Sequence, residues 1–315
     1  EAIKGKKNLN IFVLHPHNRI SSVQRKIMTT VKESNVFNIA INGNFDDCQN
    51  LVKLMFEDKD FSKSINMSGV NSINWARIIA QSVYYFYSYF LIEDKTKPIN
   101  FSVPTGNFGD VYAGYVAKKM GLPIEKLIIA SNHNNLLENC IATGLYKPST
   151  VKPSISPSMD IQVASNFERI VFDICEHNDL RVKQLMQDLK EKKQFQLSDI
   201  ELSNLQKYFL ACSVSEEETK NTIAELHKVF NVILDPHSAI GFYALKKLVS
   251  FENNYSYFCL ETAHPCKFPD AIHDAIQMDP PAPNFVKEIF AKKEKFVVLK
   301  NDLDSLKKYI ILKAS

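Results

Sequence analysis

The stretch Ser102-Val-Pro-Thr-Gly-Asn-Phe-Gly-Asp110 decides the fold class of this chain. It follows an apolar segment, residues 99–103, that is typical of a buried strand, and it leads into a helix predicted at residues 111–120. Only nine of the 315 residues are glycine, so two glycines in one short turn indicate a requirement of the backbone. The order strand, glycine-containing turn, helix is typical of an α/β fold with parallel strands.

The same turn is a candidate phosphate-binding loop. A phosphate is bound where several N–H donors point at one place, and the start of a helix offers unpaired N–H groups and a positive dipole end. Gly106 and Gly109 would let the backbone approach closely, and Thr105 and Asn107 would add side-chain donors. The alternative is an ordinary turn that binds nothing, with Asp110 as the N-cap of the helix. A short glycine motif alone does not decide between the two.

Strand-like and helix-like segments alternate along most of the chain, which predicts parallel sheets covered by helices on both faces. Strands are predicted at residues 9–14, 36–41, 99–103, 127–130, 257–260 and 296–299. Helices are predicted at residues 22–30, 46–56, 74–92, 111–120, 238–249, 269–276 and 303–310. Only helices are expected at residues 167–176, 181–191, 199–212 and 215–230, which we interpret as an all-helical insertion at about 165–230.

Length and composition narrow the class of protein. The chain is 45% hydrophobic and 23% charged, and single cores stop growing near about 250–300 residues, so we expect two lobes. The net charge of +3 argues against nucleic acid as a partner. The densest aromatic stretch, residues 84–90, is far shorter than the roughly 20 apolar residues of a membrane span. The six cysteines form no C-x-x-C pair, which favours reduced thiols in a cytoplasmic protein over disulfides or a metal site.

Five stretches together resemble threonine synthases. They are Val70-Asn-Ser-Ile-Asn-Trp-Ala-Arg77, Thr105-Gly-Asn-Phe-Gly-Asp110 with Ala113-Gly-Tyr-Val-Ala-Lys-Lys-Met-Gly-Leu-Pro123, Ser156-Pro-Ser-Met-Asp-Ile-Gln-Val-Ala-Ser-Asn-Phe-Glu-Arg169, Leu234-Asp-Pro-His-Ser-Ala239, and Thr262-Ala-His-Pro-Cys-Lys-Phe268. The resemblance runs from about Gly5 to the C-terminus. The helical insertion is similar to that of the longer, bacterial and fungal branch of the family.

The resemblance implies a two-lobed β-family (type II) pyridoxal-phosphate fold. The small lobe would be residues 1–70, incomplete at its N-terminus, and the large lobe residues 71–315. The cofactor implied is pyridoxal 5'-phosphate, and the residues implied to hold its phosphate are Gly106, Asn107, Phe108, Gly109 and Asp110. Thr262 is implied to hydrogen-bond the pyridine nitrogen, which a hydroxyl does without forcing that nitrogen to be protonated. The alternative is that Thr262 caps the helix that follows.

The start of the helix at residues 74–92 carries the candidate substrate residues. Ser72 and Asn74 can cap a helix, whereas Arg77 lies in an otherwise apolar stretch, where a fixed cation needs an anionic partner. A guanidinium group suits phosphate oxygens bidentately. The resemblance implies that Ser72, Asn74 and Arg77 bind the phosphate or carboxylate of O-phospho-L-homoserine, and an internal ion pair is the alternative for Arg77.

The activity implied by the resemblance is that of a lyase of threonine biosynthesis, in which O-phospho-L-homoserine and water give L-threonine and phosphate. In that family the lysine that holds the cofactor precedes the part matched here. We therefore expect it ahead of Glu1, name no catalytic residue in this chain, and expect the chain alone to be inactive. Two alternatives stay open: a related phospho-lyase that releases 2-oxobutyrate, and a non-catalytic ligand-binding relic of the same fold.

The resemblance to the long branch favours a monomer that acts on a small-molecule substrate. Among the histidines, His237 is expected to shape a helix start, and His264 is expected near the ring of the cofactor.

Overall fold

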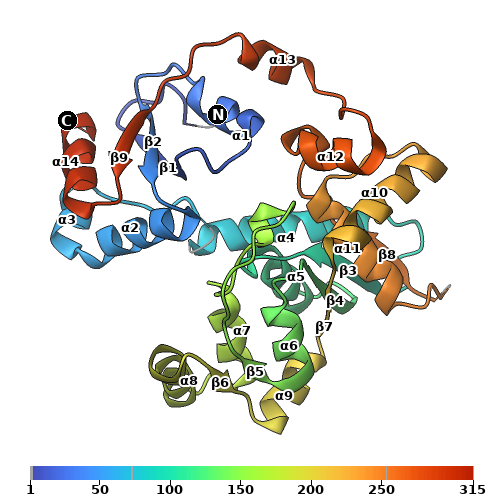
Figure 1. Cartoon of the computed structure of the whole chain (residues 1–315). Coiled ribbons are helices and arrows are strands. Elements are labelled where there is room, and N and C mark those ends of the chain that lie inside the picture. Colours follow the sequence, from blue (N-terminus) through green and yellow to red (C-terminus); the bar gives the residue numbers. More distant parts are fainter. Residues whose placement is uncertain (1–2, 72–73, 253, 315) are drawn as a thin grey trace. The chain divides into compact units, whose positions relative to one another are not determined.

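The computed structural model describes residues 3–71, 74–252 and 254–314. The chain divides into two compact units, one made of Glu1–Ser68 with Pro281–Ser315, and the other of Gly69–Pro280 (Figure 1). A parallel sheet lies in each unit, as the strand–helix alternation predicted. None of the helices in the described part of the chain is long and apolar enough to span a membrane.

The first unit contains a three-stranded parallel sheet with the order β1-β2-β9. Its strands are β1 (Ile11–Pro16), β2 (Val36–Asn42) and β9 (Val297–Lys300). Its helices are α1 (Ser22–Thr29), α2 (Phe45–Glu57), α3 (Lys59–Ser64), α13 (Asn284–Phe290) and α14 (Leu303–Ala314). The core forms where Ile39 and Ile41 of the central strand meet Leu51 and Met55 of α2 and Leu306 of α14.

The end of the chain belongs to this first unit. Strand β9 pairs with β2, and the Arg25 guanidinium bonds the Glu294 carboxylate at 2.8 Å (Nε to Oε1). The Thr29 hydroxyl donates to the same carboxylate at 2.8 Å. The predicted lobes, 1–70 and 71–315, remain a prediction, but the compact units differ from them because residues 281–315 pack with the N-terminal strands.

The second unit contains a four-stranded parallel sheet with the order β7-β4-β3-β8. Its strands are β3 (Ile99–Pro104), β4 (Ile124–Ser131), β7 (Phe209–Ser213) and β8 (Ser256–Cys259). Its larger helices are α4 (Trp75–Phe90), α5 (Gly109–Lys119), α6 (Leu136–Thr143), α10 (Glu216–Phe230), α11 (Pro236–Leu248) and α12 (Pro269–Ile276). All four strands run parallel, so their carboxyl ends lie at one edge, where open α/β sheets bind ligands.

The region predicted as an all-helical insertion contains strands as well as helices. Its helices are α7 (Phe167–Ile174), α8 (Asp179–Lys192), α9 (Asp199–Gln206) and α10. However, β6 (Phe195–Gln196) pairs with β5 (Leu145–Tyr146), and β7 joins the main sheet beside β4. The helix predicted over residues 199–212 is therefore wrong after Gln206. The apolar run Phe209-Leu-Ala-Cys-Ser213 is too short for its periodicity to separate a strand from a helix.

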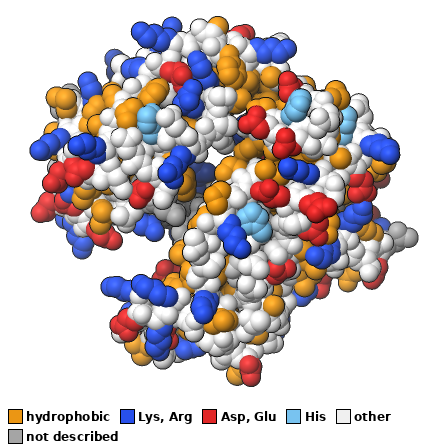
Figure 2. Space-filling view, viewed as in Figure 1, with side chains coloured by type: hydrophobic (Ala, Val, Ile, Leu, Met, Phe, Trp, Pro, Cys, Tyr) orange, Lys and Arg blue, Asp and Glu red, His pale blue; other side chains and the backbone are white. Residues whose placement is uncertain are grey.

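Charged side chains on the molecular surface are of mixed sign. On the face drawn in Figure 2, lysine and arginine side chains are interspersed with aspartate and glutamate side chains. This distribution accords with the small net charge of +3.

Candidate functional site

The turn between β3 and α5 begins with two hydrogen bonds that fix Thr105. Its backbone N–H donates to the carbonyl of Ala130 at 2.7 Å, which ties the turn to the end of β4. Its hydroxyl donates to the carbonyl of Val103 at 2.6 Å, so the hydroxyl proton is used within the turn. Thr105 therefore orients the turn, and the hydroxyl oxygen keeps only acceptor capacity.

Helix α5 begins at Gly109, and its N-cap is Phe108. A phenyl ring cannot accept hydrogen bonds from the first-turn amides, so these donors depend on a partner from elsewhere. Asp110 lies in the first turn and is not the N-cap, which corrects the alternative considered for this residue. An uncapped helix start with two nearby glycines is the geometry that favours a bound anion.

Phe108 holds the turn in a strained conformation. Its φ of 64° is left-handed, which costs about 1–2 kcal/mol for a residue with a side chain. The ring is fully buried, with centroid distances of 5.1 Å to Phe167 and 5.5 Å to Phe209. Burial of a phenyl side chain contributes about 1.5–3 kcal/mol, which offsets the strain. The side chain of Phe108 is thus an anchor in the core, and only its backbone faces the candidate anion site.

Gly106 lies under the segment Ser158–Ile161. A Cβ atom on Gly106 would overlap the carbonyl oxygen of Ser158 and lie 3.1 Å from the Cδ1 atom of Ile161. Glycine is therefore required here by packing. Gly106 and Thr105 also line a small cavity, with about 10 Å³ of free volume, together with Ser131 and further side chains.

Two hydroxyl groups beside the turn have unmet hydrogen-bonding capacity. Among the described residues of the second unit, the buried side-chain atoms without a partner are Ser131 Oγ and Ser165 Oγ. Ser131 lines the small cavity, and Ser165 precedes Asn166, whose backbone N–H and side-chain amide both donate to the carbonyl of Asn107 at 3.1 Å. Because buried polar groups are nearly always paired, two orphans beside one turn indicate a missing hydrogen-bonding partner.

The sequence analysis did not identify these two serines. The signal for Ser131 was available, because Ser131 ends the strand next to β3, and the carboxyl ends of neighbouring parallel strands meet at one edge. Ser165 lies within the family motif at residues 156–169, but the motif does not show that its side chain lies beside the turn, because that depends on how residues 156–166 fold.

Asp110 adds a titratable group to the turn. Burial raises the pKa of its carboxyl group to about 6, and the hydrogen bond from the Tyr85 hydroxyl opposes this shift. The Tyr85 hydroxyl lies 2.8 Å from the Asp110 carbonyl oxygen and 3.2 Å from Oδ1. The Asp110 carboxyl group therefore changes its charge near pH 6.

The start of α4, which carries the predicted substrate residues, contacts α5 through one aromatic pair. The Trp75 ring lies 6.3 Å from the ring of Tyr112 on α5. Asn74 caps α4 by accepting from the N–H of Ala76 at 2.9 Å. Arg77 is exposed and donates to the carbonyl of Val70 at 2.8 Å.

Ser72 lies outside the described residues. Thr262 follows β8 at the same sheet edge as the turn, where its side chain is exposed. The Thr262 N–H donates to Ser238 Oγ at 3.1 Å. His264 caps the short helix at Pro265–Lys267 through Nδ1, which accepts from the Cys266 N–H at 3.2 Å.

Comparison with known proteins identifies the family. Residues 238–310 match the family model described as the C-terminal part of threonine synthase. The threonine synthase of Pseudomonas aeruginosa is 43% identical over 304 residues, which are 96% of this chain and 65% of that protein. The Saccharomyces cerevisiae threonine synthase is 43% identical over 292 residues, 87% of this chain and 57% of that protein. The crystal structure of pyridoxal-phosphate-bound threonine synthase from Brucella melitensis aligns at a TM-score of 0.92 and 44% identity, covering 99% of this chain and 67% of that one.

The chain belongs to the threonine synthase family. The resemblance noted from the sequence motifs is thereby confirmed, and so is the type II pyridoxal-phosphate fold. The chain spans 57–65% of the length of the Saccharomyces and Pseudomonas threonine synthases that it matches.

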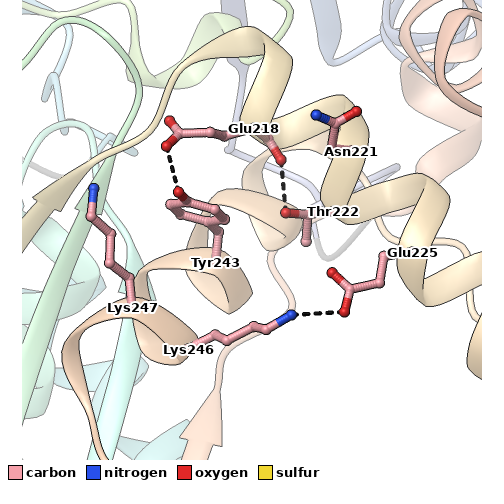
Figure 3. A pocket seen from close by; sticks show the side chains of 7 residues that line it. All are labelled: Glu218, Asn221, Thr222, Glu225, Tyr243, Lys246 and Lys247. Carbon is pink, nitrogen blue, oxygen red and sulfur yellow. Dashed lines mark hydrogen bonds and ion pairs between the residues drawn. The ribbon is translucent and has the colours of Figure 1, made fainter.

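This member of the family has a second, larger hollow between α10 and α11, of about 450 Å³ (Figure 3). Several of the polar side chains that line it are hydrogen-bonded or ion-paired within the hollow. The Tyr243 hydroxyl donates to Glu218, the Thr222 hydroxyl donates to the Glu218 carbonyl at 2.7 Å, and Lys246 pairs with Glu225 at 2.7 Å. None of the predicted site residues lines this hollow. Within the described residues there is also no cluster of three or more His, Cys, Asp or Glu side chains suited to a metal.

Proposed function

We propose that this chain is the part of a threonine synthase that binds the phosphate and ring of pyridoxal 5'-phosphate. The whole protein would convert O-phospho-L-homoserine and water to L-threonine and phosphate. The observation that carries the proposal is the β3–α5 turn, where an uncapped helix start and two unpartnered hydroxyl groups surround Gly106 and Asn107. These groups fit a phosphate monoester, because its oxygens accept several hydrogen bonds at once.

Each proposed contact has a defined role. The backbone amides from Gly106 to Asp110, with the hydroxyl groups of Ser131 and Ser165, would hold the cofactor phosphate. The Thr262 hydroxyl would hydrogen-bond the pyridine nitrogen. When bound, the cofactor supplies an electron sink for the carbanion of the substrate, and the protein supplies orientation and charge.

The start of α4 would bind the substrate. The Arg77 guanidinium, with Asn74 and Ser72, would hold the phosphate or carboxylate of O-phospho-L-homoserine. Two observations support this assignment: Arg77 is exposed, and the neighbouring Trp75 contacts Tyr112 of α5. A cation on the departing phosphate stabilises the charge that develops there.

The test uses protein expressed from the natural gene, incubated with pyridoxal 5'-phosphate and O-phospho-L-homoserine, with products identified by mass spectrometry. Threonine and inorganic phosphate in equal amounts are expected. 2-Oxobutyrate in place of threonine would contradict the proposed product, and no turnover would leave the ligand-binding relic as the better account. R77M should raise KM by about tenfold or more, as expected for a lost charged contact, while K246M in the α10–α11 hollow serves as the matched control.

We further propose that the protein is a monomer and that it is located in the cytoplasm. Its cysteines at positions 48, 140, 175, 212, 259 and 266 are free thiols, which supports a reducing compartment. Light scattering of the natural gene product measures the mass in solution, and a stable dimer would contradict the monomer.

A further inference from the structure

A buried polar cluster at the start of α11 links the two ends of the proposed cofactor site. Asp235, His237 and Ser238 are 0%, 4% and 1% exposed. The Asp235 carboxylate accepts from the His237 N–H at 2.9 Å and from His237 Nδ1 at 2.7 Å. Its other oxygen accepts from the Ser238 N–H at 3.3 Å and from the Ser238 hydroxyl. Capping α11 requires only the two backbone bonds, so the side-chain bonds need a further explanation.

One side of this cluster, which we call its first arm, is His237, and it reaches the segment that covers the β3–α5 turn, referred to below as the phosphate turn. The backbone N–H of Ser158 points at His237 Nε2, at 3.3 Å. Because an amide N–H can only donate, Nε2 must accept, and the proton of the neutral imidazole lies on Nδ1, where it is donated to Asp235. Ser158 is also the residue whose carbonyl oxygen lies over Gly106. The imidazole thus fixes the segment that closes on the turn.

The second arm reaches Thr262. The Ser238 hydroxyl donates its one hydrogen bond to Asp235. Its oxygen accepts a hydrogen bond from the Thr262 N–H at 3.1 Å. Thr262 is therefore held by the same carboxylate that orients His237, through one intervening hydroxyl group.

Helix α11 is held firmly enough to act as a common support. A Cβ atom on Gly241 would lie 2.9 Å from the Cys259 sulfur on β8 and 3.0 Å from Pro104 on β3, so the helix backbone is in close contact with both strands. The Ser102 hydroxyl on β3 donates to the Gly241 carbonyl at 2.6 Å. These are the strands whose ends carry the phosphate turn and Thr262.

We propose that His237 and Asp235 are positioning residues that couple the phosphate turn to Thr262, and so fix the spacing between the sites for the phosphate and the pyridine nitrogen. This inference rests on the proposed function. It goes beyond a helix cap because it assigns separate effects to the two arms: His237 acts on phosphate binding, and Ser238 acts on the ring.

Three variants of the natural gene product separate the arms. H237N retains an N–H for Asp235 but loses the acceptor for Ser158, whereas H237Q places an amide oxygen near the position of Nε2. The affinity for inorganic phosphate should fall about tenfold in H237N, as for one lost hydrogen bond, and should return to within about threefold of wild type in H237Q. S238A should retain phosphate affinity but weaken pyridoxal 5'-phosphate about tenfold and shift its absorbance maximum.

A spectroscopic measurement on the wild type tests the contact without a ligand. Nitrogen-15 NMR of His237 should show a protonated Nδ1 and an unprotonated Nε2, and a proton on Nε2 would overturn the proposal. If wild type binds both probes and H237N binds phosphate equally well, the coupling is wrong while the proposed function stands. If wild type binds neither phosphate nor pyridoxal 5'-phosphate, the proposed function and the coupling both fail.

Discussion

The β3–α5 turn and the α10–α11 hollow are both concave, but they differ in volume and in how far their polar groups are paired. The hollow is large, at about 450 Å³, but the Tyr243 hydroxyl is bonded to Glu218 and the Lys246 ammonium group is paired with Glu225. The turn encloses only about 10 Å³, yet it has a strained Phe108, an uncapped helix start and two buried hydroxyl groups without partners. Strain and unmet hydrogen bonds, rather than volume, therefore mark the candidate ligand site.

Replacing Gly106 by alanine should have the largest effect on the turn. The added Cβ would overlap the backbone carbonyl of Ser158, so we expect a loss of about 1–3 kcal/mol in the free energy of unfolding. The affinity for inorganic phosphate, measured by calorimetry, should fall at least about tenfold, because the turn must move. G121A at the other end of α5 is the matched control, since its φ of 108° makes it strained but its Cβ would meet nothing within 4 Å. Wild-type phosphate affinity in G106A would contradict the packing argument.

Asp110→Asn tests the charge at the turn. The folded pKa of about 6 lies above the ordinary 3.8, so the stabilising contribution of this carboxyl group is complete below pH 4 and is lost as the pH rises through 6. This difference in pKa corresponds to a loss of about 3 kcal/mol in wild type, and D110N should remove that slope in urea denaturation between pH 4 and 7.

The carboxyl group of Glu201 should change the stability with pH in the opposite direction to that of Asp110. Arg181 lowers the pKa of its carboxyl group to about 2, so its contribution is present above pH 4.5 and is lost as the pH falls towards 2. A D110N profile that keeps the wild-type slope between pH 4 and 7 would show that Asp110 is not the responsible group.

Removing one hydroxyl group from each region sharpens the comparison. S131A deletes an unpartnered group, so the free energy of unfolding should stay level or rise by up to about 1 kcal/mol, while phosphate affinity falls about threefold to tenfold. T222A deletes a hydroxyl that donates to Glu218, so unfolding free energy should fall by about 0.5–1 kcal/mol with phosphate affinity unchanged. Thermal unfolding and calorimetry measure both quantities, and the same pattern in the two variants would remove the distinction between the regions.

Lys246→Met in the hollow should have the smallest effect. Lys246 and Glu225 are each about half-exposed, and such pairs contribute about 0–1 kcal/mol. Phosphate affinity and the free energy of unfolding should both remain within the error of the measurement. Weaker phosphate binding in K246M would instead identify the hollow as an anion site.

The strand–turn–helix around Gly106 could be predicted from the sequence because its signals are local. An apolar run, two glycines and a helical segment follow one another over residues 99–120, and the observed bounds of β3 and α5 lie within two residues of the predicted ones. The alternative with Asp110 as the N-cap was wrong, because a left-handed Phe108 is stabilised by burial against Phe167 and Phe209, which are distant in the sequence.

The parts that were missed depend on contacts between distant segments. Strand β7 forms because it pairs with β4, and its five residues are too few to show a periodicity of their own. The fold of a long loop determines that Ser165 has no partner and that Ser158 lies over Gly106. Sequence patterns do not predict the fold of such a loop. The family motifs identified the turn and Thr262, whereas their roles stay predictions until binding is measured.

The discontinuity of the first unit has a consequence for synthesis on the ribosome. Arg25 and Glu294, which bond in the folded unit, are 269 residues apart in the chain. At a translation rate of about 5–20 residues per second, β9 is synthesised about 10–50 s after β2. During that time the edge of β2 that pairs with β9 has no partner strand. The second unit is continuous, so it can fold completely in that interval. Strand β2 is thus the segment most exposed to mispairing in the nascent chain, and the one with most to gain from a chaperone.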